Sequence, residues 1–257
     1  MPSNVQLSEA NAQFIEAKTT REFMNCLSDI PHNAIIFIDI DDTIITPVSK
    51  TFRKSPYNKL IDEIKKNKDK YPNYTEIVSN WRLQRKAMLI DENWPLLLAQ
   101  LKEKFAVYGL TKMDVGKFGN IESMEKWRYQ ELKSLGIEFP NRLNIPEGTL
   151  NDASFYKGLF MTGLNAKSQT ILHYSQYLKT NTMVLLDDRE ESLEDVGQFC
   201  EKQAIGFVGI LFKGLEQFRD TPDPAIALFQ KEHLIQYAEW LEDEKAMSMI
   251  KESKKGQ

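Results

Sequence analysis

The sequence predicts an α/β fold, in which a Rossmann-like parallel sheet carries helices on both of its faces. Three observations support this prediction. Short apolar runs alternate with longer helical patterns along the chain. The runs are apolar without clean alternation, as is typical of strands that are covered on both faces. Of the 257 residues, 42% are hydrophobic, so the chain can bury a substantial core.

Five apolar runs are the expected strands, because each is rich in Ile, Val, Leu or Phe and too short for a stable helix. They occupy residues 34–38, 105–110, 157–161, 182–186 and 205–211. Helical patterns, with apolar residues three and four positions apart, occupy residues 8–27, 122–135, 168–178, 192–202 and 224–251. Strands that alternate with helices are joined by right-handed crossovers, which make the sheet parallel.

A long segment separates the first two expected strands. Residues 46–97 exceed the length of an ordinary connection and contain helical patterns at 59–66 and 74–90. We expect this segment to form a small helical insertion above the sheet. Residues 1–45 and 98–257 then form the α/β core domain.

Composition excludes several classes of protein. Lys and Arg number 33 and Asp and Glu number 37, so the formal net charge is −4. This charge argues against a nucleic-acid scaffold role. No run approaches the roughly 18 apolar residues that span a membrane, and no Sec-type signal is visible at the N-terminus. We therefore expect a soluble, cytoplasmic protein, with export by a route that lacks such a signal left open.

Cysteine and histidine offer no metal site in this sequence. Cys26 and Cys200 lie far apart and match no metal or disulfide pattern, so both are expected to be small buried apolar groups. His32, His173 and His233 are isolated and match no ligand spacing. No Gly-rich phosphate loop of the G-x-x-x-x-G-K type is present, which excludes nucleotide triphosphate binding by that route.

Carboxylates follow two of the expected strands. The first strand ends in Asp39-Ile40-Asp41-Asp42-Thr43, and the fourth ends in Asp187-Asp188. In open α/β sheets the ligand crevice lies outside the carboxyl ends of the strands. If these two strands are neighbours, four or five carboxylates converge there, and their like charges require a cation. Oxygen ligands with this charge suit Mg²⁺.

Hydrogen-bond donors follow the second and third of the expected strands. Thr111 closes the second strand, and Lys167 lies at the start of the helix that follows the third. Taken alone, the threonine is a typical cap or turn residue and the lysine a typical surface residue. Beside a carboxylate-bound metal, however, a hydroxyl and an ammonium group form a site for a tetrahedral oxyanion such as phosphate.

These residues, in this order, resemble the four motifs of the haloacid dehalogenase-like superfamily. The first is a D-x-D-x-T motif at Asp39–Thr43, and the later ones are Thr111, Lys167 and the acidic pair Asp187-Asp188. The variant FIDIDDTI is similar to acid-phosphatase-type and uncharacterised bacterial branches of the superfamily. Many members have Gly where this chain has Asp42.

One position departs from the pattern of the superfamily. Many relatives carry Asn or Asp four residues after the second acid of the pair, and this chain has Ser192 there. In those relatives the Asn or Asp contacts the motif lysine or metal-bound water, and it is open which residue of this chain makes that contact. Glu191 or Asp195 could substitute, and spacing does not decide between them.

The resemblance implies a Mg²⁺-dependent phosphohydrolase that cleaves a phosphomonoester. Asp39 attacks phosphorus and forms an aspartyl-phosphate. Asp41 protonates the leaving oxygen and later activates water, and we expect crowding beside Asp39 to raise its pKa. Mg²⁺ is held by Asp39, the main-chain carbonyl of Asp41, and Asp187 or Asp188. Thr111 and Lys167 complete the cradle of the phosphate oxygens.

Residues 46–97 resemble, by their position, the cap insertion of the superfamily, which closes over the site. Candidate substrate contacts are Tyr57, Arg82, Arg85 and Trp94, and weaker candidates are Asn120, Trp127 and Arg128. The expected substrate is a small phosphorylated molecule, with a phosphoprotein also open. Two other readings stay open: a phosphotransferase or mutase with the same phosphoenzyme, and a non-catalytic scaffold that binds a partner.

Overall fold

The computed structural model of this protein describes residues 12–53, 60–218 and 221–255. These residues form an eight-stranded sheet in the order β1-β10-β9-β2-β5-β8-β7-β6. In this order β1, β10, β9, β2, β5 and β8 each pair in parallel with the next strand. The pairs β8–β7 and β7–β6 are antiparallel and form one edge of the sheet. The predicted α/β fold with a mostly parallel sheet is therefore confirmed. The strand bounds are β1 Ala12–Ala17, β2 Ile35–Ile38, β5 Ala106–Thr111, β6 Gly148–Leu150, β7 Ala153–Tyr156, β8 Leu159–Met161, β9 Thr182–Asp187 and β10 Gly206–Phe212.

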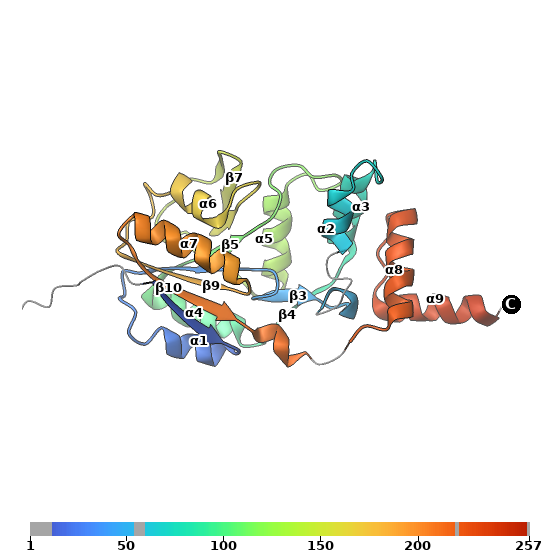
Figure 1. The fold of residues 1–257 in the computed structure, drawn as a ribbon, viewed down its shortest axis with the longest axis horizontal. Coiled ribbons are helices and arrows are strands. Elements are labelled where there is room, and N and C mark those ends of the chain that lie inside the picture. The colour runs from blue at the N-terminus through green and yellow to red at the C-terminus, as the bar shows by residue number, and fades with distance from the viewer. Residues whose placement is uncertain (1–11, 54–59, 219–220, 256–257) are drawn as a thin grey trace, which may run out of the picture.

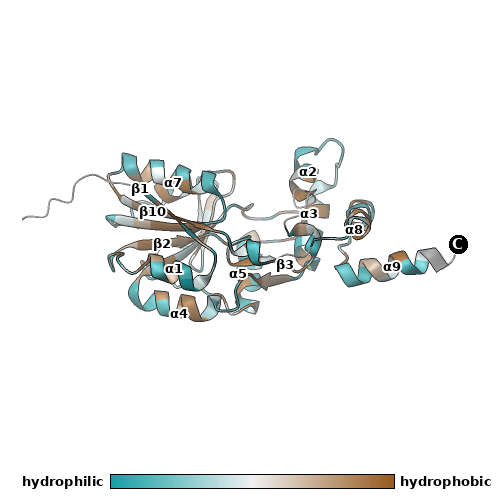
Figure 2. Ribbon diagram, turned by 60° about the horizontal axis from the view of Figure 1, so that its bottom comes forward, coloured by the Kyte–Doolittle hydropathy of each residue, from teal (hydrophilic) through white to brown (hydrophobic). Residues whose placement is uncertain are grey.

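Helices cover both faces of this sheet (Figure 1). On one face lie α1 (Thr20–Cys26) and α4 (Trp94–Lys104). On the other lie α6 (Lys167–His173) and α7 (Glu190–Lys202). Successive residues of a strand point to opposite faces, so Ile36 and Ile38 of β2 pack into the first core, whereas Ile35 and Phe37 pack into the second. Burial on both faces explains why the apolar runs show no alternation, and Figure 2 shows the hydrophobic strands between the helices.

The helix α5 (Met124–Ser134) follows β5 and contributes to the same core as α1 and α4. Ser123 begins this helix, and its hydroxyl accepts a hydrogen bond from the backbone N–H of Lys126 at 3.2 Å. This side-chain cap satisfies one of the unpaired N–H groups of the first turn. The helix places Arg128 near the carboxyl end of β2, where it contacts Asp41.

A second lobe lies beside the sheet domain (Figure 1). Within the described residues it consists of a two-stranded antiparallel sheet, a short 3-10 helix and four α-helices. These are β3 (Ile45–Pro47), β4 (Ala87–Leu89), η1 (Lys50–Phe52), α2 (Leu60–Lys66), α3 (Tyr74–Gln84), α8 (Pro224–Tyr237) and α9 (Asp243–Lys255). Its separate apolar core joins Phe52 and Trp81 of the insertion to Leu234 and Trp240 of the C-terminal segment.

Hydrogen bonds also link the insertion to the C-terminal helices. The Thr51 hydroxyl donates to Gln230 Oε1 at 2.5 Å, and the Ser49 hydroxyl donates to Asp243 Oδ1 at 2.6 Å. Gln230 is fully buried, and its amide nitrogen donates to the Leu241 carbonyl at 2.8 Å. The C-terminal segment, which we expected as one flanking helix of the core, is therefore two helices that belong to the second lobe. Ala238, with a φ of 51°, ends the first of them.

The structure differs from the sequence predictions at further places. The predicted strand 157–161 begins at Leu159, the predicted helix 168–178 ends at His173, and the hairpin of β6 and β7 was not predicted. The described part of the predicted helix 8–27 contains β1 before α1, because β1 pairs in parallel with β10 at the sheet edge. The predicted helix 74–90 ends at Gln84 and is followed by β4. The predicted insertion 46–97 includes the start of α4, yet Trp94 of this helix is fully buried in the main core. No helix among the described residues has both the length and the apolar character needed to cross a membrane.

Candidate functional site

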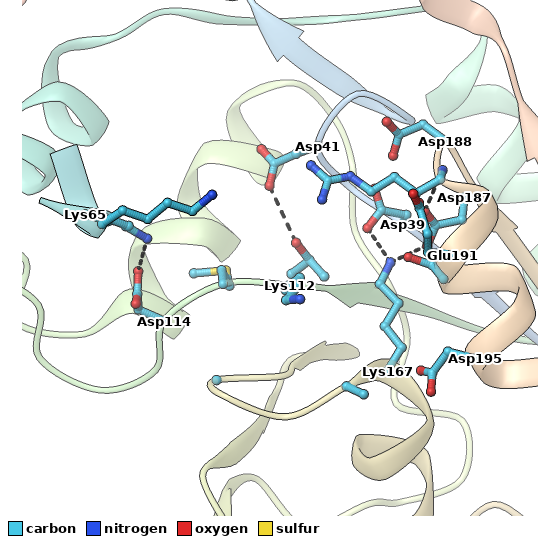
Figure 3. A pocket seen from close by; sticks show the side chains of 17 residues that line it. Asp39, Asp41, Lys65, Lys112, Asp114, Lys167, Asp187, Asp188, Glu191 and Asp195 are labelled. Carbon is cyan, nitrogen blue, oxygen red and sulfur yellow. Dashed lines mark hydrogen bonds and ion pairs between the residues drawn. The ribbon is translucent and has the colours of Figure 1, made fainter. Parts of the chain in front are cut away.

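The predicted site residues meet at the carboxyl edge of the parallel sheet. Asp39 directly follows β2, Thr111 ends β5, Asp187 ends β9 and Lys167 begins α6. Because β2 lies between β9 and β5, these strand ends are adjacent. All six predicted residues line one cavity of about 660 Å³, namely Asp39, Asp41, Thr111, Lys167, Asp187 and Asp188. Figure 3 shows the arrangement of the five charged residues among them.

Lys167 lies between two buried carboxylates. Its Nζ atom donates hydrogen bonds to Asp39 Oδ1 and to Asp187 Oδ2, each at 2.5 Å. The lysine is 4% exposed, Asp39 6% and Asp187 1%. Burial lowers the pKa of Lys167, but the negative charges of Asp39 and Asp187 outweigh it, and the net pKa is raised. The lysine is therefore a fixed positive charge at neutral pH.

Three carboxylates crowd together beside this lysine. Oxygen atoms of Asp39, Asp187 and Asp188 all lie within 4.8 Å of one another. Burial raises the pKa of Asp39 well above its ordinary value; Lys167 opposes this shift, and the charges of Asp187 and Asp188 add to it. Burial, followed by the charges of Asp187 and Asp42, raises the pKa of Asp188 to about 7. One lysine does not balance this cluster, so it fits a divalent cation that prefers oxygen ligands, such as Mg²⁺.

Asp41 is held by positive groups. Its Oδ2 atom accepts a hydrogen bond from Arg128 Nη2 at 2.7 Å and a longer one from the Thr111 hydroxyl at 3.5 Å. Arg85 Nη2 lies 3.6 Å from Asp41 Oδ1. Burial raises the pKa of Asp41, but the charges of Arg128 and Arg85 outweigh it and lower the net pKa. The expectation that crowding beside Asp39 raises this pKa is therefore wrong, because the two arginines dominate.

The candidate substrate contacts of the insertion have protein partners. Arg82 Nη2 is 2.7 Å from Asp114 Oδ2, and the Arg82 side chain is buried. Arg85 pairs with Glu131 at 3.0 Å. Trp94 is buried in the main core and does not line the cavity, which corrects its assignment as a substrate contact. Tyr57 lies outside the described residues.

The three weaker candidates also have partners in the protein. The Asn120 side chain donates to Asn80 Oδ1 at 2.8 Å. Trp127 lies beneath the guanidinium groups of Arg82, Arg85 and Arg128 at 4.9–6.0 Å. Arg128 itself is 3% exposed. None of these three residues lines the cavity.

Asp195, one of the two candidates for the contact to the motif lysine, hydrogen-bonds instead to Ser168, the residue after Lys167. Its carboxylate accepts from the backbone N–H of Ser168 at 2.9 Å and from the Ser168 hydroxyl at 2.6 Å. Ser168 follows Lys167, so this contact anchors the first turn of α6 at the lysine. Ser192 and Glu191 line the cavity wall. No sequence spacing could assign Asp195, because its position depends on the packing of α7 against α6.

Basic residues line the cavity on the side of the second lobe. Lys65 and Lys66, in the last turn of α2, contribute to its wall, as does Lys112 after β5. Lys65 Nζ lies 3.0 Å from Asp114 Oδ2. Figure 3 shows Lys65 across the cavity from Asp39 and Asp187. These lysines carry no distinguishing signal in the sequence, since solvated lysines near helix ends are common.

Comparisons with known proteins give a family for this chain. The model of the family described as "Protein of unknown function (DUF2608)" matches residues 16–247, which include every residue of the site. "Uncharacterized protein RP296" of Rickettsia prowazekii (strain Madrid E) is 28% identical over 240 residues, covering 88% of this chain and 86% of the relative. No solved structure matches the chain. The chain therefore belongs to the DUF2608 family of proteins of unknown function.

Proposed function

We propose that this protein is a Mg²⁺-dependent phosphohydrolase with a haloacid dehalogenase-like fold. It cleaves a phosphomonoester through an aspartyl-phosphate on Asp39. The expected substrate is a small phosphorylated molecule in the cytoplasm. The sequence resemblance supports this proposal by its four motifs, and the structure supports it by bringing all four to one cavity at the carboxyl edge of the sheet.

One observation carries the proposal. Lys167 is shared, at 2.5 Å, between Asp39 and Asp187, which follow and end two neighbouring parallel strands. Asp188 lies beside them. Burying Asp39 and Asp187 with one lysine, beside a half-buried Asp188, is costly, and apolar side chains in their place are often as stabilising. Buried titratable groups with shifted pKa values in a cavity are therefore better explained by chemistry than by stability.

The donor set fits the ion that the resemblance implies. Asp39, Asp187 and Asp188, with the main-chain carbonyl of Asp41, would hold Mg²⁺ through oxygen atoms only. When bound, the ion supplies positive charge that offsets repulsion between an anionic ester and its anionic nucleophile.

The residues of the chain then divide the reaction between them. Asp39 attacks phosphorus, and the bond from phosphorus to the leaving oxygen breaks. Lys167 orients Asp39 and, with the Thr111 hydroxyl, offers donors to the phosphoryl oxygens. In the first step Asp41 gives a proton to the leaving oxygen from its protonated form, which is a minor population because the arginine contacts lower its pKa. In the second step its carboxylate accepts a proton from the water that attacks the aspartyl-phosphate, and its arginine contacts favour this ionised form.

The backbone conformation of Asp42 also supports the resemblance to the superfamily. Asp42 has a φ of 63°, in the left-handed region that Gly adopts without strain. Many members of the superfamily have Gly at this position of the motif. Asp is one of the few other residues that adopt this conformation at modest cost, and its carboxylate accepts a hydrogen bond from the Thr46 hydroxyl at 3.0 Å.

The position of the second lobe is consistent with a cap. Its helix α2 brings Lys65 and Lys66 to the wall of the cavity that holds the candidate catalytic residues. A cap in this place would contact the leaving group and exclude water from the site. The cap in this proposal comprises β3, β4, α2 and α3. It packs against Leu234 of α8 and is hydrogen-bonded through Ser49 to Asp243 at the start of α9.

The test is hydrolysis of 4-nitrophenyl phosphate by the full chain, with Mg²⁺ and then with excess EDTA. We expect turnover that depends on Mg²⁺, and a loss of at least about 10³-fold in kcat for Asp39→Asn. Asp29→Asn is the matched control, because Asp29 is exposed in a turn. A chain that is inert toward a broad panel of phosphate esters would instead be a non-catalytic scaffold. Phosphate recovered on an added alcohol would indicate a phosphotransferase.

A further inference from the structure

We propose that Arg128 is a positioning residue for Asp41, and that Arg85 of the second lobe shares this role. Arg128, on the sheet domain, and Arg85, on the second lobe, together orient the Asp41 carboxylate. This inference rests on the proposed function, in which Asp41 exchanges a proton with the leaving group and with water.

The contacts form one closed group of four charged side chains. Arg128 donates through Nη2 to Asp41 Oδ2 and through Nη1 to Glu131 Oε2, each at 2.7 Å. Arg85 donates through Nη2 to Glu131 Oε1 at 3.0 Å and Oε2 at 3.1 Å. The same nitrogen lies 3.6 Å from Asp41 Oδ1. Two positive and two negative groups therefore compensate one another.

Three of these four charged side chains have little solvent exposure, so removing them from water costs free energy. The side chains of Arg128, Arg85 and Glu131 are 4%, 5% and 12% exposed, whereas that of Asp41 is 42% exposed. Apolar residues in place of a buried ion network are often neutral or stabilising. The exposed member is the one that lines the cavity. The three buried members thus fix a carboxylate that reaches the site.

Aromatic rings hold the guanidinium groups in place. The Arg85 guanidinium lies 4.7 Å from the centre of the Trp81 ring, and the Arg128 guanidinium lies 4.9 Å from that of Trp127. Trp127 also lies 5.6 Å from the Arg85 guanidinium. A cation over an aromatic face is attracted to it, most strongly when both are desolvated. These contacts restrict the arginines before any substrate is bound.

The two arginines come from different parts of the fold. Arg128 is on α5 of the sheet domain, whereas Arg85 follows α3 of the second lobe. Glu131 bridges them from the same helix as Arg128. Asp41 itself follows β2. The direction of its carboxylate therefore depends on the placement of the second lobe against the sheet domain.

The first experiment compares Arg128→Met with the unaltered chain on 4-nitrophenyl phosphate with Mg²⁺. We expect kcat to fall about 10²-fold, the usual contribution of a positioned acid or base, with KM changed less than about threefold. In an Asp41→Asn background the same Arg128→Met change should cause no further loss in kcat. This non-additivity distinguishes positioning of Asp41 from general loosening of the structure.

Arg82→Met is the matched control. Arg82 is also a buried arginine with a 2.7 Å ion pair, but it lies on the second lobe, its partner is Asp114, and it reaches Asp41 only through a longer-range charge interaction. Arg82→Met should lower the melting temperature, and its coupling to Asp41→Asn should be much smaller than that of Arg128→Met. Arg128→Lys keeps one positive charge and should recover part of the lost kcat. If Arg128→Met does not fold, Arg128→Lys replaces it in the comparison with and without Asp41→Asn.

Two outcomes overturn the inference in distinguishable ways. If the unaltered chain hydrolyses the ester and Arg128→Met reduces kcat equally with and without Asp41, Arg128 does not act through Asp41. In that case the proposed function stands and the inference falls alone. If the unaltered chain is inert toward all esters with Mg²⁺, the proposed function falls and the inference falls with it.

Discussion

Lys167 Nζ lies 2.5 Å from Asp39 Oδ1, although 128 residues separate the two along the chain. This contact joins the start of α6 to the end of β2 in a region where both side chains are buried. The same ammonium group neutralises Asp187. The stability of the strand ends and the chemistry of the site therefore depend on one lysine.

Replacing this lysine should destabilise the protein. Lys167→Met leaves Asp39 and Asp187 buried without a counter-charge, and we expect the free energy of unfolding in EDTA to fall by about 3 kcal/mol. Mg²⁺ should restore part of this loss, since the ion supplies the missing positive charge. Urea denaturation with and without Mg²⁺ measures both effects. Lys126→Met, at an exposed position of α5, is the control and should change stability by less than about 0.5 kcal/mol.

Metal-free protein should lose stability as the pH rises. Burial raises the pKa of Asp188 to about 7 and that of Asp42 to about 6, whereas the ordinary value is 3.8. The folded state thus holds these protons more tightly than the unfolded chain. Its free energy of unfolding should decrease as the pH rises from about 4 to about 7. Thermal melts in EDTA measure this slope, and Asp188→Asn should flatten its upper part. A slope unchanged by Asp188→Asn would show that Asp188 does not cause this pH dependence.

Asp195 should matter for both stability and turnover. Asp195→Ala removes the acceptor for the Ser168 N–H and hydroxyl, and loss of such a cap costs about 1 kcal/mol. We also expect kcat to fall about 10-fold, because the adjacent Lys167 loses its anchor. Asp223→Ala is the matched control, since Asp223 caps α8 in the second lobe. It should cost similar stability while kcat stays unchanged.

Gly163 allows the loop between β8 and α6 to pass close to another segment. It has a φ of +59°, and a Cβ atom there would overlap the carbonyl oxygen of Asp152. Gly116, with a φ of +69°, has no heavy atom within 4 Å of such a Cβ. Gly116→Ala should therefore cost only the backbone strain, about 1 kcal/mol. Gly163→Ala should cost about 2 kcal/mol more because of the overlap. Equal melting temperatures for the two variants would contradict this interpretation.

Local sequence patterns predicted the central strands because burial on both faces leaves continuous apolar runs, as in β2 and β9. They failed at β1, whose exposed edge residues become a strand only by pairing with β10. The six site residues were predictable because five of them lie at a strand end or within three residues of one, and Lys167 begins the helix that follows β8. The contacts of Glu131 and Asp195 could not be predicted, because helix packing that no short-range pattern encodes brings their partners near.

The second lobe joins segments that leave the ribosome at very different times. Trp240, which packs 5.1 Å from the Phe52 ring, is synthesised 188 residues after Phe52 and well after Trp81. Throughout synthesis of the sheet domain, the early half of this lobe lacks its apolar cover. It is therefore the part of the nascent chain that chaperones and proteases can reach longest.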